Sequence, residues 1–125
     1  MTAGLAAARA NSILNIYRAT AYTAVSAFVK LHTGDPGAAG TANASANTTR
    51  NAATFAAPSS GSMAISSIGA WTMTASETIT HISIWDASTA GNFTESWALT
   101  ASVPVVNGST FSLTTLTLAF TPIAA

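Results

Sequence analysis

From Thr20 onward, apolar and polar residues alternate with a period of two, and β-branched and aromatic side chains are frequent. Clusters of Gly, Pro, Asn, Asp and Ser interrupt the alternation every eight to twelve positions or so. This pattern is typical of an all-β sandwich or barrel. We predict a mainly β protein: an antiparallel β-sandwich of about seven or eight short strands forming a single domain over residues 21–125.

The clearest predicted strand spans residues 79–85. Its even positions place Ile82 and Ile84 on one face, and the opposite face carries Ile79, His81, Ser83 and Trp85. Because both faces carry large apolar side chains, we expect both to be covered. Further strands are predicted over 28–32, 50–56, 63–65, 68–73 and 93–99, followed by C-terminal strands carrying Leu113, Leu116, Leu118 and Phe120 and stopped by Pro122.

Two turns stand out between these strands. Pro36 and Gly37 occupy the second and third positions of a predicted type II turn. Asn107 and Gly108 predict a β-hairpin, because both residue types tolerate a positive φ angle. The stretch 38–48 has no apolar side chain larger than alanine and is expected to be a long loop.

The first twenty residues differ from the rest, because they favour a helix over residues 3–18 with Thr2 as its N-cap. One face of this helix carries Ala6, Ala10, Ile13 and Tyr17. A helix this short is not stable alone in water. Residues 1–20 are therefore expected to pack either on the β domain or on a neighbouring subunit, and both alternatives stay open.

Composition excludes several classes of function. The chain has 125 residues, 49% of them apolar, only 6% charged, with no cysteine and no formal net charge. Disulfides, thiolate zinc sites and cysteine nucleophiles are excluded. Four basic residues cannot supply the phosphate contacts that a nucleic-acid partner requires. Mean hydropathy is +0.40, but polar residues interrupt every apolar run, so we expect neither a membrane segment nor a secretory signal.

Candidate chemistry is sparse. His32 with Asp35 and His81 with Asp86 have the residue types of a metal site with two histidines and a carboxylate, if their strands are neighbours. The plainer interpretation is that both aspartates open turns through Asx hydrogen bonds. Glu95, near Trp85 and Trp97, is the one carboxylate that suggests a hydrolase.

No serine lies in a Gly-x-Ser-x-Gly elbow, and no glycine cluster opens a helix as a phosphate loop does. We therefore predict no catalytic, cofactor-binding or metal-binding residue and no enzymatic activity. A nearly uncharged surface of Ala, Ser, Thr and Asn suits close packing against copies or partners, although a soluble monomer has the same composition. The candidate contacts are Ile13 and Tyr17 on the helix and Ala38, Asn43 and Asn47 in the loop, and the candidate surface aromatics are Trp71, Trp85 and Trp97.

Residues 31–37 (LHTGDPG) and 80–86 (THISIWD), followed by Gly91-Asn92 and Trp97-Ala98-Leu99, resemble a family of small tailed-bacteriophage virion proteins. The helix, an arginine strand near Arg50 and a terminal hairpin follow in the same order, so the resemblance covers nearly the whole chain. The family tends to have a glycine at the position of Ser83 and an aromatic at that of Thr49. Members are labelled tail-fibre or minor tail proteins, and similar sandwiches serve as capsid decoration proteins.

The resemblance implies a non-enzymatic structural protein of the virion, made in the bacterial cytoplasm and carried on the outer surface of the particle. A single compact domain without coiled-coil or repeated shaft segments favours a capsid decoration (cement) protein that adheres across capsid subunits. The alternative is a tail or tail-fibre component that contributes to host attachment. The expected partners are other virion proteins, including copies of the chain itself. A small hydrolase that uses Glu95 is a third hypothesis.

Overall fold

The computed structural model describes residues 4–21 and 25–119 of the chain. Thr2, Phe120 and Pro122, which the sequence assigned to a helix cap and the last strand, lie outside the described residues. The elements are α1 (Ala7–Leu14), a 3-10 turn η1 (Asn15–Arg18), β1 (Ala27–His32), β2 (Asn51–Phe55), β3 (Ser62–Ile68), β4 (Trp71–Thr72), β5 (Glu77–Trp85), β6 (Phe93–Val105), β7 (Thr110–Phe111) and β8 (Thr117–Ala119).

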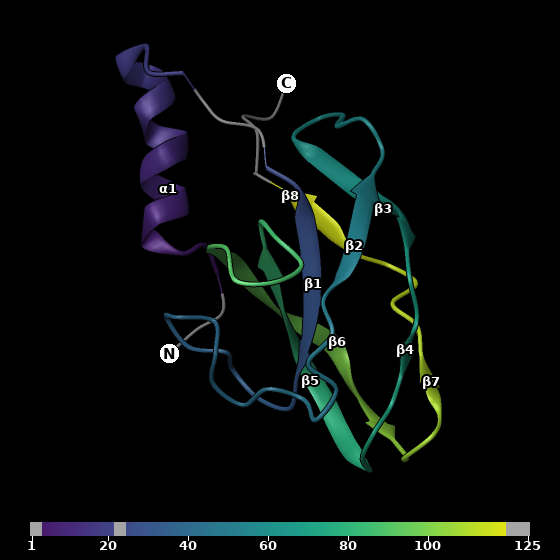
Figure 1. Cartoon of the computed structure of the whole chain (residues 1–125). Helices are drawn as coiled ribbons and strands as arrows, with labels where there is room; N and C mark the ends of the chain where they lie inside the picture. The colour runs from purple at the N-terminus through teal and green to yellow at the C-terminus, as the bar shows by residue number, and fades with distance from the viewer. Residues whose placement is uncertain (1–3, 22–24, 120–125) are drawn as a thin grey trace.

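The described strands form two antiparallel sheets (Figure 1). The larger sheet has six strands in the order β6-β5-β1-β2-β3-β8, and the smaller sheet pairs β4 with β7. In the centre of the large sheet, β1 pairs with β5 so that Leu31 lies opposite Ile82 and His32 lies opposite His81. The mainly β, antiparallel fold with a short N-terminal helix is confirmed.

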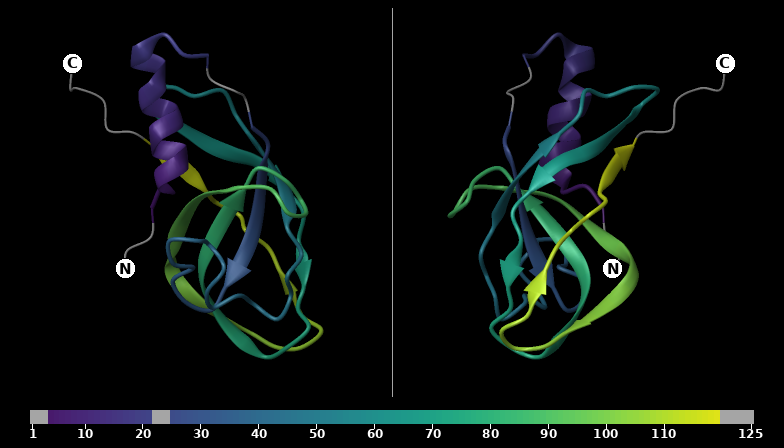
Figure 2. Two further views of the ribbon diagram at one scale, coloured as in Figure 1. Left: turned by 60° about the vertical axis from the view of Figure 1, so that its left-hand side comes forward. Right: turned by 90° about the vertical axis from the view of Figure 1, so that its right-hand side faces the viewer.

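One apolar core connects the two sheets. Val29 and Leu31 of β1 are buried together with Ile82 and Ile84 of β5. The small sheet contributes Trp71 and Phe111 to the same cluster, with their ring centres 5.9 Å apart. Figure 2 shows how the strands curve around this common interior. Alternating apolar positions thus meet from both layers, as the period of two predicts.

The strand β5 departs from simple alternation at one point. The pairing register with β6 shifts between Ile79 and His81, which marks a β-bulge or a similar irregularity. Ile79 therefore joins Ile82 and Ile84 in the core, and the prediction that it shares a face with His81 is wrong. A bulge reverses the face of every residue beyond it, and sequence alternation alone does not reveal where it occurs.

Two predicted strand boundaries also change. The segment 68–73 is not one strand, because β3 ends at Ile68 and β4 begins at Trp71 in the other sheet. In contrast, β6 continues well past the predicted end at residue 99 and pairs with β5 as far as Val105. Pro104 lies within β6, where its missing N–H is tolerated because β6 is the edge strand of the six-stranded sheet.

The turn at Asn107–Gly108 is present, but it does not close a hairpin. Ser109 N donates to Val106 O at 3.0 Å, and Gly108 has a φ of 85°. The φ angle of Asn107 is not positive, in contrast to that of Gly108. The strand that follows, β7, pairs with β4 instead of returning along β6. The local signal identifies the turn, whereas the pairing partner depends on the sheet to which each strand belongs.

The N-terminal helix is shorter than predicted. It begins at Ala7 with Ala6 as its N-cap, and the 3-10 turn η1 extends it to Arg18. Residues 4–6 are extended and bridge to β6, with Leu5 opposite Glu95. The backbone bonds of this segment go to a sheet edge, so the segment cannot also be the first turn of a helix. No helix in the described part of the chain is long and apolar enough to cross a bilayer.

Candidate functional site

The outer face of β1 and β5 carries a buried polar network, which the sequence did not predict as a unit. The His32 side chain is 0% exposed, and its Nδ1 lies 2.8 Å from Ala42 O while its Nε2 lies 2.7 Å from Ser83 Oγ. Ser83 Oγ also accepts a hydrogen bond from Trp85 Nε1 at 2.8 Å. These contacts join two strands of the sheet to the loop that follows β1.

The contact with Ala42 fixes the tautomer of the neutral His32 ring. A carbonyl oxygen only accepts, so His32 Nδ1 carries the proton and donates to Ala42 O. Nε2 then accepts from the Ser83 hydroxyl. Burial lowers the pKa of His32, and the nearby positive charge of Lys30 lowers it further, although the contact with Ala42 opposes them. His32 is a neutral structural histidine with both ring nitrogens satisfied.

The loop after β1 is held by its own polar side chains. Asp35 Oδ1 accepts from Gly37 N at 2.8 Å, as an Asx turn requires, which confirms the prediction for this aspartate. Asn43 Nδ2 donates to Asp35 O at 2.9 Å, and Asn47 Nδ2 donates to Thr72 O at 2.8 Å. Two of the three predicted contact residues in this loop therefore have internal roles, while Ala38 is exposed.

Asp86 has a different role from the one predicted. Its Oδ1 accepts from Asn92 N at 2.6 Å and its Oδ2 accepts from Asn92 Nδ2 at 2.9 Å. These bonds reach across the β5–β6 loop, so Asp86 closes the ends of that loop instead of opening a local Asx turn. The hydrogen bonds from Asn92 hold the pKa of Asp86 below its usual value.

Arg50 is the residue that sequence reasoning missed. Its guanidinium lies over the Trp85 ring, and Nη1 donates to Ala87 O at 3.1 Å and to Ala90 O at 2.6 Å. It therefore attaches the β5–β6 loop to the start of β2. The signal in the sequence is an arginine in a chain with only four basic residues, placed immediately before a strand.

The imidazoles and carboxylates do not converge. His32 and His81 do lie opposite each other, because their strands are neighbours. Within the described ranges, however, no three His, Asp or Glu side chains gather closely enough to hold a metal ion. Glu95 is half-buried, and burial raises the pKa of its carboxyl, while the nearby Trp97 indole and, less strongly, the positive charge of Arg9 oppose this effect.

The three tryptophans have different environments. Trp71 is 1% exposed and Trp85 is 7% exposed, so the prediction that they are surface aromatics is wrong. Burial of each indole is possible because its Nε1 still donates a hydrogen bond, to Thr49 O from Trp71 and to Ser83 Oγ from Trp85. Trp97 is only half-buried and lines an open groove of about 820 Å³ between β6 and the segment 109–117.

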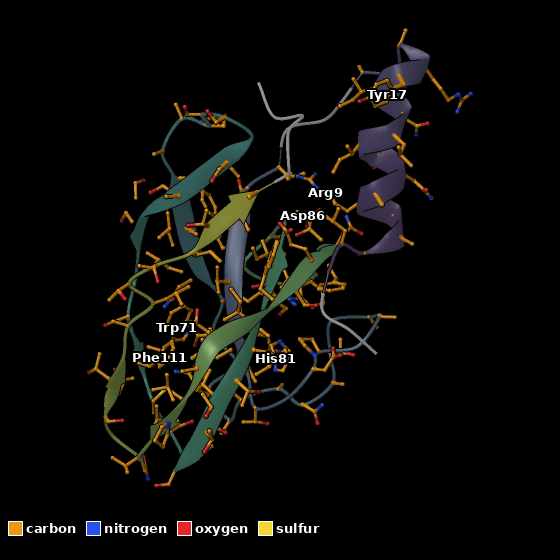
Figure 3. All side chains as sticks on the ribbon, turned by 180° about the vertical axis from the view of Figure 1, so that it is seen from behind. Arg9, Tyr17, Trp71, His81, Asp86 and Phe111 are labelled. Atoms are coloured by element: carbon orange, nitrogen blue, oxygen red, sulfur yellow. The ribbon has the colours of Figure 1, made fainter. Side chains whose placement is uncertain are left out.

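The helix presents apolar side chains to solvent. Ile13 is half-buried, but Tyr17 is 89% exposed, and Leu14 and Ile16 are exposed as well. Figure 3 shows Tyr17 at the end of the helix far from the sheets, and Arg9 near Asp86 where the helix meets them. Ile13 and Tyr17 are therefore not equivalent: only Ile13 is partly covered by this chain.

Comparison with known proteins agrees with a structural role in a virion. No curated protein matches the chain significantly. The family model described as podophage GP4 fiber I protein gp80 matches residues 4–121, a range that includes every helix and strand described above. Because this match covers almost the whole chain, the protein belongs to the gp80 family of phage fibre proteins and is a phage virion structural protein.

Proposed function

We propose that this protein is a non-enzymatic tail-fibre component of a podophage particle, which works by adhesion to neighbouring virion proteins on the outer surface. The observation that carries the proposal is the family match over residues 4–121 to a fibre protein. The buried network around His32 supports it, because His32, Asp35 and Asp86, three of the groups that suggested chemistry, hold loops.

The adhesive role has a physical basis in the surface of the chain. A chain with only 6% charged residues can approach another backbone without the cost of desolvating many charges. The exposed Leu14 of α1 and the exposed Ile16 and Tyr17 of η1 are the apolar side chains that such contact buries. We propose that a second copy of the chain covers them, with Ile13 at the rim of the contact and the loop residues Ala38, Asn43 and Asn47 as further contacts.

Sequence reasoning alone favoured capsid decoration, since the chain lacks a shaft. The family description as a fibre protein favours the tail instead, and a compact sandwich can form the head or the attachment point of a fibre whose shaft is another protein. Host contact is a further role of a fibre. For this role Trp97 is the remaining aromatic candidate, because it lines an open groove whereas Trp71 and Trp85 are buried.

Copy number separates the tail from the capsid. We would purify virions of the phage that encodes this chain and measure the molar ratio of this protein to the major capsid protein by mass spectrometry with labelled peptide standards. A tail fibre predicts a small number of copies per particle, comparable to other tail proteins. A ratio near that of the capsid subunit would contradict the tail assignment and restore the decoration protein. Absence from purified particles would contradict both.

A further inference from the structure

The N-terminal arm, defined here as the described residues 4–18, is joined to the domain mainly by a short stretch of strand pairing. Ala6 N donates to Thr94 O at 2.8 Å, and Ser96 N donates to Gly4 O at 2.8 Å. Gly4 N also donates to Ser96 Oγ at 3.2 Å. The arm thus adds a short strand to the free side of β6, and its main-chain bonds do not depend on which copy supplies the strand.

The helix that follows this strand is loosely packed. None of the described residues of α1 is fully buried, and its exposed side chains include Leu14. A groove of about 450 Å³ lies between the helix and the segment 86–94, lined by Arg9, Asn15 and Phe93 among others. A close-packed helix would leave no such space, so the helix contributes little to holding the arm on its own domain.

The chain reverses direction after the helix at a strained residue. Ala19 has a φ of 56°, in the left-handed region that favours glycine, and it forms the C-cap of η1. A residue other than glycine is strained there, because its Cβ lies too close to the following carbonyl oxygen. The described residues between Ala19 and β1, which are Thr20, Ala21, Val25 and Ser26, are exposed. A strained connection of this kind favours domain swapping.

We propose that the arm is exchanged between copies, so that residues 4–6 of one chain pair with β6 of a second copy in the same register as seen here. Exchange preserves every main-chain bond of the pairing and allows Ala19 to leave the left-handed region. Exchange also provides the link between copies that an assembled fibre needs, and this biological role rests on the proposed function. The exchange of the arm between copies does not rest on it.

The register makes this testable with a disulfide. Leu5 and Glu95 are directly opposite, and the flanking residues carry the hydrogen bonds, so the two form a non-hydrogen-bonded pair with Cα atoms about 4.5 Å apart. That separation lies within the range of natural disulfides. The chain contains no cysteine, so a cross-link between Leu5→Cys and Glu95→Cys has no competing thiol.

We would mix the two single variants, refold them together, oxidise them mildly and analyse them on a non-reducing gel, with one chain tagged. Exchange predicts a disulfide-linked heterodimer of Leu5→Cys with Glu95→Cys. The control mixes Leu5→Cys with Thr117→Cys, which lies on β8 at the opposite side of the sheet. A heterodimer that forms equally in the control would reflect collision and would overturn the proposal. So would a double variant that closes only within one chain while the mixed single variants give no heterodimer.

A second variant keeps the test independent of the cysteines. Ala19→Gly relieves the strain of the closed connection, so it should lower the fraction of dimer or larger species seen by analytical ultracentrifugation. An unchanged distribution, or a wild-type chain that is monomeric at every concentration, would contradict exchange. Neither result would alter the copy number measured in virions, so failure of the arm exchange is distinguishable from failure of the proposed function.

Discussion

The guanidinium carbon of Arg50 lies 3.8 Å from the centre of the Trp85 ring. Two residues 35 positions apart in the chain thereby connect β2 to the end of β5, and the same guanidinium holds two carbonyls of the β5–β6 loop. Trp85 in turn donates to Ser83, which donates to His32. The β5–β6 loop and the loop after β1 are therefore connected by one continuous set of contacts across the outer face of the sheet.

Replacing Arg50 tests the strength of that connection. Arg50→Ala removes the cation–π contact and two hydrogen bonds, and should lower the free energy of unfolding by about 1–3 kcal/mol. Arg50→Lys should recover only part of the loss, because an ammonium does not reproduce the planar guanidinium. Arg18→Ala is the control, because Arg18 is exposed and bonds locally to Asn15. Equal urea midpoints for Arg50→Ala and Arg18→Ala would show that the Trp85 contact contributes nothing.

His32 predicts a pH dependence of stability. The pKa of His32 in the folded protein is lowered from its ordinary 6.5 by burial, so the unfolded chain takes up a proton first as the pH falls. Stability is then fully present above about pH 7 and decreases below 6.5, by at most about 1.4 kcal/mol per pH unit.

Urea titrations between pH 7.5 and 5.5 measure this slope. His32→Asn keeps a donor near Ala42 O but cannot titrate, so its curve should be flatter than that of the wild type. His81→Asn is the matched control, and it should retain the slope because the buried imidazole is still present. A His32→Asn curve parallel to the wild type would assign the pH dependence to another group.

Gly40 and Gly37 separate steric contact from backbone strain. Both have positive φ, 71° and 72°. A Cβ at Gly40 would meet the Phe93 ring, with Cδ2 at only 2.4 Å, whereas at Gly37 the nearest atom is Ala42 Cβ at 3.8 Å. Gly37→Ala should therefore cost about 1–2 kcal/mol from the backbone alone. Gly40→Ala should cost a further 1–3 kcal/mol or so from overpacking. Equal losses in thermal denaturation would mean that the loop moves away from Phe93 freely.

Glu95 and Glu77 should respond oppositely to neutralisation. Burial raises the pKa of Glu95 above its ordinary 4.5, so its ionised form is disfavoured in the folded protein and this cost is present at neutral pH. Glu95→Gln should then increase stability at pH 7. Glu77 accepts hydrogen bonds from Ser45 Oγ and Ala46 N, so Glu77→Gln should decrease stability. Destabilisation by Glu95→Gln would show that the favourable contacts of its charge, including the attraction of Arg9, outweigh the cost of burial.

The same pair bears on the hydrolase hypothesis. A catalytic carboxylate at Glu95 requires that any glycosidase or esterase turnover by the purified protein disappear in Glu95→Gln and persist in Glu77→Gln. We expect no turnover in the wild type. Substrate cleavage that is lost only with Glu95 would contradict a purely adhesive role.

Much of the fold follows from local patterns in the sequence. The alternation in residues 28–32 and 79–85 identifies β1 and β5, because the alternate residues of each strand share a face that packs in the core. The positive φ at Gly37 and Gly108 follows from turn residues whose conformation is set locally. Pairing is different: nothing near Asn107–Gly108 indicates that β7 joins β4, because that choice depends on contacts with a distant strand.

The candidate site was harder to predict for the same reason. His32 and His81 were recognised as neighbours only conditionally, and the partner that decides the role of His32 is Ser83, 51 residues away. Arg50 bonds to carbonyl oxygens, which every residue possesses, so no side-chain motif indicates its target. Tyr17 lies in η1 at the end of the predicted helix, and its exposure depends on how loosely the helix packs.

The location of the protein on the particle tests the central claim most directly. The N-terminal arm is the region proposed to join copies, so a peptide tag is better inserted in the exposed turn at Ser88–Thr89. Gold-labelled antibody against that tag would then be imaged on purified virions by electron microscopy. We predict gold at the tail fibres and none over the shell. Gold distributed evenly over the capsid would contradict the fibre assignment.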